Sequence, residues 1–276
     1  MESRKAIALV LALTALCAAA IVGLGGCGKG GPGGGAESGL GPVWAQASRT
    51  TCDESRNVSD SVVFEYDSQG NLVKSVCRFE NAGIYAITYE YSDFTPEGYP
   101  QTLVQTAEGG TAVQTSTSKT TYTMENGRAT TARTVTEEGF TTMESTYTYH
   151  ANGKIRSQTD RIDLGSQAVL NTTTYDENGL PLQQSVENSF SGSSGSTATK
   201  ASYEWTFDTA GNPAGYTLTT SNSDGLASTT EYQVKCDDHG NIVRVLDAQG
   251  NTVSEIEYVQ IDNPSTYVWL QANIRS

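Results

Sequence analysis

The feature that most constrains the fold is a turn motif, Asp-x-x-Gly-Asn, that recurs along the chain. An aspartate at the start of a tight turn accepts a backbone hydrogen bond from just ahead of it, and glycine adopts the positive φ that closes a hairpin. The motif therefore predicts a chain that reverses its direction many times, with these residues in structural roles. The motif residues are Asp67 and Gly70, Asp208 and Gly211, Asp237 and Gly240, Asp247 and Gly250, with a weaker copy at Asp176 and Gly179.

The spacing of these turns sets the size of a repeating unit. Further weak copies fill the gaps, so that turn glycines recur every 26 to 32 residues between Gly70 and Gly240. A second turn signal, such as Ser223-Asp-Gly225, lies midway between successive glycines. Each unit therefore holds two strands and two turns, and Gly250 adds one short hairpin.

The segments between turns alternate between apolar and polar residues. Tyr203, Trp205 and Phe207 share one face of a strand, while Glu204 and Thr206 share the other. This pattern is typical of antiparallel sheet with one face in water. The turns predict an all-β, up-and-down meander of roughly 14 to 16 strands, and a sheet that wide curls or splits. We expect no helix to cover it, so it folds on itself as a barrel, a half-barrel or a rolled sheet.

The repeat resembles the YD repeats of the RHS family, in which an aromatic residue and Asp precede two variable residues, Gly-Asn and an apolar residue. The best matches run from Tyr66 to Leu72, from Tyr175 to Pro181 and from Phe207 to Pro213. The resemblance covers most of residues 60–260 and implies a long, spiralling antiparallel sheet. Large members of that family enclose a toxic C-terminal segment. This chain has far fewer units and no separate domain after Tyr258, so we do not expect encapsulation.

The N-terminus has the parts of a secretory signal: Arg4 and Lys5, an apolar run from Ala6 to Val22, and small residues before Cys27. Leu24-Gly25-Gly26-Cys27 resembles the lipobox of bacterial lipoproteins, which implies cleavage before Cys27 and lipid on its thiol. We therefore expect a signal peptide at 1–26, a lipidated cysteine with a Gly-rich tether at 27–42, and the β domain at 43–276. The alternative is an uncleaved transmembrane anchor.

The negative net charge of the chain limits which partners it can bind. The whole chain has a net charge of −14, and without residues 1–26 it keeps 30 acidic and 15 basic residues, or −15. Nucleic acid binding needs a basic stripe, and adhesion to anionic lipid needs basic clusters. We therefore expect no nucleic acid partner, and a membrane partner only through covalent lipid. The predicted location is the cell envelope, outside the cytoplasm.

No catalytic motif is present: the chain has no P-loop, no His-Glu-x-x-His and no nucleophile elbow. The two histidines, His150 and His239, fall in turns, and one carboxylate per turn is too few for Ca²⁺. We expect no enzyme activity, no cofactor and no metal.

Three cysteines remain in the predicted β domain, in an oxidising compartment. We expect a Cys52–Cys77 disulfide to fasten the N-terminal edge. Cys236 occupies the aromatic position before its turn, which favours a buried free thiol.

These features favour a non-catalytic, lipid-anchored binding or scaffold protein whose ligand is an envelope glycan or a protein. The alternative is a lipid carrier that holds an acyl chain in an apolar half-barrel.

Overall fold

The computed structural model describes residues 40–53, 55–80, 85–109, 112–190 and 196–274. The predicted signal peptide, Cys27 and residues 28–39 of the predicted tether lie outside the described residues. Among the residues described, no helix is long and apolar enough to cross a membrane.

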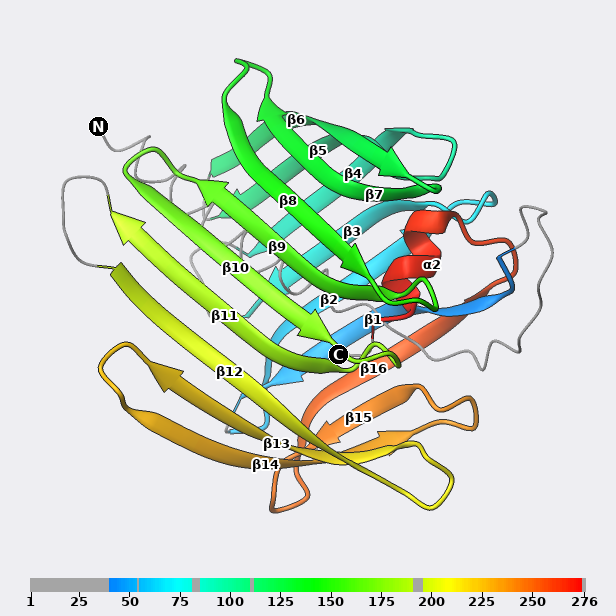
Figure 1. The fold of residues 1–276 in the computed structure, drawn as a ribbon, viewed down its shortest axis with the longest axis vertical. Helices are drawn as coiled ribbons and strands as arrows, with labels where there is room; N and C mark the ends of the chain where they lie inside the picture. Colours follow the sequence, from blue (N-terminus) through cyan, green and yellow to red (C-terminus); the bar gives the residue numbers. More distant parts are fainter. Residues whose placement is uncertain (1–39, 54, 81–84, 110–111, 191–195, 275–276) are drawn as a thin grey trace.

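Sixteen antiparallel strands form an up-and-down meander, and β1 pairs with β16 to close it into a barrel (Figure 1). The all-β prediction is confirmed, and of the three shapes left open the chain adopts the barrel. The strands are β1 (Val43–Cys52), β2 (Val58–Tyr66), β3 (Leu72–Phe79), β4 (Ala86–Phe94), β5 (Pro100–Gly109), β6 (Ala112–Glu125), β7 (Arg128–Thr136), β8 (Thr141–Tyr149), β9 (Ile155–Asp163), β10 (Gln167–Tyr175), β11 (Pro181–Phe190), β12 (Ser196–Phe207), β13 (Pro213–Asn222), β14 (Ala227–Cys236), β15 (Ile242–Leu246) and β16 (Thr252–Ile261).

The prediction that no helix covers the sheet is wrong. Helix α2 (Thr266–Ala272) follows β16, and its N-cap is Ser265, whose Oγ accepts a hydrogen bond from the backbone N–H of Val268 at 3.3 Å. This cap satisfies one of the N–H groups that a helix start leaves open. Val268 and Ala272 pack with residues of β1 to β5, whereas Leu270 packs with residues of β7, β9 and β10. The helix therefore lies between opposite walls, at one end of the barrel (Figure 1). We call this the helix end, and the opposite one the far end.

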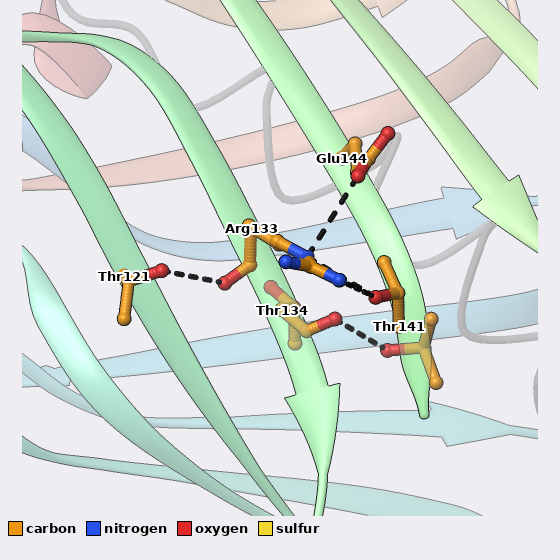
Figure 2. A network of polar contacts seen from close by, with 6 residues as sticks. Thr121, Arg133, Thr134, Thr141 and Glu144 are labelled. Carbon is orange, nitrogen blue, oxygen red and sulfur yellow. Dashed lines mark hydrogen bonds and ion pairs between the residues drawn. The ribbon is translucent and has the colours of Figure 1, made fainter. Parts of the chain in front are cut away.

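Many apolar side chains face the interior, and most charged side chains face outward. On β2, Val62 and Phe64 are buried in the cluster that includes α2, whereas Val63 and Glu65, which alternate with them, are exposed. The ion pairs between described residues lie on the exposed outer face. Figure 2 shows one of them, in which Arg133 on β7 lies 3.8 Å from Glu144 on β8 and also donates to Thr141. The others are Lys74–Glu65, Lys119–Asp93 and Arg244–Glu255.

The predicted Cys52–Cys77 disulfide is not formed. Cys52 lies at the end of β1 and Cys77 lies on β3, so β2 runs between them. Cys52 is opposite Val58, and Cys77 is opposite Val62, farther along β2. Two strand spacings alone separate the Cα atoms by about 9.5 Å, and a disulfide needs less than about 7 Å. The prediction failed because the sequence shows that both cysteines lie near the first hairpin but does not show that β2 separates their strands.

Candidate functional site in the barrel interior

The aspartates of the predicted turns form hydrogen bonds with the backbone of their own turns. The five motif glycines have φ between +74° and +86°. In each turn, the aspartate Oδ1 accepts from the backbone N–H groups two and four residues ahead, as Asp208 does from Ala210 at 2.9 Å and Asn212 at 2.8 Å. Asp67, Asp176, Asp237 and Asp247 repeat this pattern. Within the described parts of the chain, no group of three His, Cys, Asp or Glu side chains could hold a metal ion.

A side-chain donor near the end of each of several even-numbered strands bonds back to the preceding strand. Tyr122 on β6 donates its hydroxyl to the carbonyl of Pro100 on β5 at 2.8 Å. That carbonyl precedes the first backbone pair of these strands, Thr102 with Lys119, so the side chain satisfies a group outside the ladder. The same bond joins Tyr66 to Gln46, Tyr149 to Ala129, Trp205 to Pro181, Cys236 to Pro213 and Tyr258 to Ile242.

Cys236 is in no disulfide, as the sequence favoured, but it is half-buried and not fully buried. Its Sγ lies 3.4 Å from the Pro213 carbonyl. Burial is the main cause that raises the pKa of this thiol to about 11, with the neighbouring carboxylate of Asp237 adding to it.

The two turn histidines contact neighbouring segments. The His239 ring stacks on Trp44 with the ring centroids 4.3 Å apart, and the His150 Nε2 lies 3.0 Å from the Tyr175 carbonyl. Trp44 thus packs on a turn, a role that its position beside the predicted tether did not reveal.

The C-terminal segment closes the helix end. Ser265 donates its backbone N–H to the Gly70 carbonyl, and Tyr267 donates to the Glu97 carbonyl, both at 3.2 Å. A void of only about 10 Å³ remains between α2 and the wall, lined by residues that include Ala45, Tyr66 and Tyr267. Because a water molecule needs at least that volume, this void has no room for a larger ligand.

Beyond this filled end, one interior wall is polar. We call the six residues that form it, on β8 to β11, the polar wall. Gln158 and Asp160 on β9 are buried, and the Gln158 Nε2 donates to both carboxylate oxygens of Asp160, at 3.1 and 2.8 Å. Backbone register places the others beside them. The polar wall consists of Ser145, Gln158, Asp160, Asn171, Thr173 and Gln184.

Asp160 is the carboxylate of this wall. Burial raises its pKa above the ordinary value, although the hydrogen bonds from Gln158 act in the opposite direction. No ion pair between described residues includes Asp160, so none of the described Lys and Arg side chains balances its charge within ion-pair distance. A carboxylate in such a setting is suited to accept hydrogen bonds from a polar ligand.

Aromatic rings continue the interior surface from the polar wall. We call Tyr203, Trp205, Tyr216 and Tyr232 the aromatic row. Tyr216 stacks on Tyr232 with centroids 4.9 Å apart, and it lies 4.7 Å from Trp205 and 5.8 Å from Tyr203. All four rings are half-buried. The sequence predicted the shared face of Tyr203 and Trp205, but not the polar wall beside it.

A second hollow, of about 380 Å³, lies where β14, β15 and β16 meet, lined by residues that include Lys235, Val243 and Ile256. Its acidic groups already have partners. Glu255 pairs with Arg244 at 2.7 Å, and Glu257 accepts from Ser48 at 2.8 Å. The interior surface is therefore the better candidate site.

These features define a closed sixteen-stranded barrel with a C-terminal helix in one end. No protein-family model matches the chain, and no curated protein matches it. Among solved structures, it is similar to a porin-like protein from Bacteroides uniformis, with 16% identity and a TM-score of 0.41 over 78% of this chain and 96% of that chain. A porin-like protein from Bacteroides vulgatus gives 12% and 0.32 over 78% and 97%.

A structure of TcdB2-TccC3 without its hypervariable C-terminal region gives 10% identity and a TM-score of 0.30, and the match covers 85% of this chain and 15% of that one. At these identities and TM-scores, the likeness carries no argument about what the chain binds or does.

Proposed function

We propose that the chain is a non-catalytic binding protein of the cell envelope, held on a membrane by lipid on Cys27, with a glycan or protein ligand. The observation that carries the proposal is the division of the interior. The helix end is filled by α2, whereas the polar wall and the half-buried aromatic row offer hydrogen-bonding and stacking groups. Binding sites typically combine apolar and aromatic surface with a few convergent polar groups.

The packing of the helix end favours this role over an acyl-chain carrier. A carrier needs a large apolar cavity, but α2 leaves only about 10 Å³ against the wall. Phe64, Ile87 and Val268 are buried members of one apolar cluster that includes α2.

The anchor position agrees with access from the far end. Val43 begins β1 at the helix end, where it pairs with Ile261 and belongs to the α2 cluster. A lipid on Cys27 would therefore hold the helix end toward the membrane, through a tether of about 15 residues that reaches roughly 20 Å. The far end would point away from the membrane.

The test is the anchor cysteine. Cys27→Ser should abolish acylation, which releases the domain or leaves an uncut precursor, while Cys52→Ser should leave anchoring intact. Mass spectrometry of the membrane-bound native protein checks this directly. An unmodified Cys27 with residues 1–26 still attached would refute the lipoprotein proposal.

A further inference from the structure

We propose that the polar wall and the neighbouring aromatic row form a binding site for a neutral sugar unit. This inference rests on the proposed binding function and names the class of its ligand. The residues of the polar wall are adjacent to one another on neighbouring strands. Backbone register places Asp160 opposite both Ser145 and Asn171. Gln158 is opposite Thr173, which is opposite Gln184, so one patch spans four strands.

The patch has hydrogen-bonding capacity that the protein leaves unused. Gln158 is 5% exposed, and its Oε1 is buried without a hydrogen-bond partner, although its Nε2 donates to Asp160. A buried acceptor without a donor costs free energy, and a ligand hydroxyl would remove that cost. Because Asp160 positions the amide, Oε1 stays available beside a carboxylate that accepts further bonds.

A ligand would reach the polar wall on its β10 and β11 side. Asn171, Thr173 and Gln184 are half-buried, so solvent reaches the strands β10 and β11 while β9 is covered. Gln184 donates to Asn171 at 3.5 Å, the long limit of a hydrogen bond, and this weak contact is easily exchanged for a ligand hydroxyl.

The aromatic row supplies the second element of sugar recognition. Gln184 is opposite Ala201 on β12, and Tyr203 follows two residues later on the same face. The C–H groups of a sugar ring are apolar and can lie against an aromatic ring while the hydroxyls bond to amides and carboxylates.

The charges favour a neutral sugar. The polar wall contains no Lys or Arg. Arg161, the residue after Asp160 on β9, lies opposite Glu144 in the strand register and faces outward. An anionic sugar would meet the Asp160 carboxylate without a balancing cation. One carboxylate is also too few for a calcium site, which takes six to eight oxygens.

The experiment is a calorimetric titration of the full chain with three neutral probes: maltotetraose, cellotetraose and chitotetraose. We expect at least one to bind. Asn171→Ala and Asp160→Asn should each weaken that binding by about tenfold or more, since each removes hydrogen bonds to a buried ligand. The matched control is Thr172→Ala, which changes the next residue on β10 on the opposite face and should leave affinity unchanged.

Gln184→Ala repeats the test at a half-exposed position where truncation threatens folding less, and a thermal melt checks each variant. Failure of all three probes to bind would overturn the inference, while anchoring through Cys27 remains to be judged by its own experiment. Binding that survives all three wall substitutions would also overturn it, yet would support the broader binding function.

Discussion

A hydroxyl or ring N–H near a strand end explains why the repeat favours Tyr and Trp over other apolar residues. The acceptors in five of these bonds share one position, two residues after a turn glycine. At three of them the residue is a proline, which supplies a carbonyl but no N–H. The donor therefore completes the hydrogen bonding where the backbone ladder has not yet begun.

Removing one such donor tests this role. Tyr122→Phe should lower the free energy of unfolding by about 1–2 kcal/mol, because the Pro100 carbonyl loses its partner while the ring stays in place. The control is Tyr203→Phe, whose hydroxyl makes no hydrogen bond with a described residue and should cost much less. Urea denaturation of the two variants gives the comparison. Equal effects would contradict the proposed role of the bond.

Asp160 predicts a dependence of stability on pH. Burial raises its pKa in the folded state, so the folded protein binds a proton more tightly than the unfolded chain does. The stabilising contribution of the proton is therefore present at low pH and is lost as pH rises through the interval above the ordinary value of 3.8.

Asp160→Asn removes this loss, so the variant should be more stable than the wild type at pH 7, and the difference should shrink toward pH 4. Thermal melts across this range measure it. A variant less stable than wild type at pH 7 would show that the charged carboxylate is stabilised in the folded state.

At the level of elements, the hairpin turns were predictable because their geometry is local. An aspartate, a glycine three residues later and the bonds between them lie within one short segment, as at Asp208 to Asn212. Barrel closure was not predictable, since it depends on contacts such as Ser48 to Glu257, which are 209 residues apart. The repeat indicated many strands, but whether the last meets the first depends on the twist summed over all of them.

Neither helix α2 nor the polar wall was predicted from the sequence, and the reasons differ. The segment Thr266 to Ala272 is seven residues long and includes β-branched and aromatic residues that also suit a strand. A local signal was Ser265 just before it, because serine is typical of an N-cap. The polar wall was missed because the repeat predicts apolar residues at inward positions, where β9 instead has Gln158 and Asp160.

The C-terminal segment packs against one of the hairpin turns. The same Gly→Ala substitution should therefore have different effects at that turn and at an open one. Gly179 and Gly211 have φ of +86° and +82°, so Ala at either position is strained by about 1–2 kcal/mol. A Cβ on Gly179 would lie 1.8 Å from the Asn273 carbonyl oxygen, whereas one on Gly211 meets nothing within 4 Å. Gly179→Ala must therefore also displace the segment that follows α2.

Hydrogen exchange distinguishes the two variants. Gly179→Ala should speed exchange of the amides at 266–274, and Gly211→Ala should leave those amides as protected as in the wild type. Equal protection in both variants would mean that the segment does not depend on this turn.

For the whole molecule, the decisive property is the polarity of the outer and inner faces of the barrel wall. A membrane-spanning barrel carries an apolar outer band about 25 Å tall. Here the outer face bears ion pairs at four places, including Lys74–Glu65 on β3 and β2 and Arg133–Glu144 on β7 and β8. The buried apolar residues around α2 lie inside the barrel.

This arrangement predicts that lipid, and not the barrel wall, holds the protein on a membrane. A chain that begins at Gly28 lacks both the proposed signal peptide and the proposed anchor, Cys27, and it should enter the aqueous phase when a Triton X-114 solution separates. The full chain recovered from membranes should enter the detergent phase, and so should its Cys52→Ser variant, because that change leaves Cys27 in place. If the chain from Gly28 also collects in detergent while its far-ultraviolet circular dichroism remains that of β-sheet, the outer face itself binds lipid, and an anchor on Cys27 would not be needed.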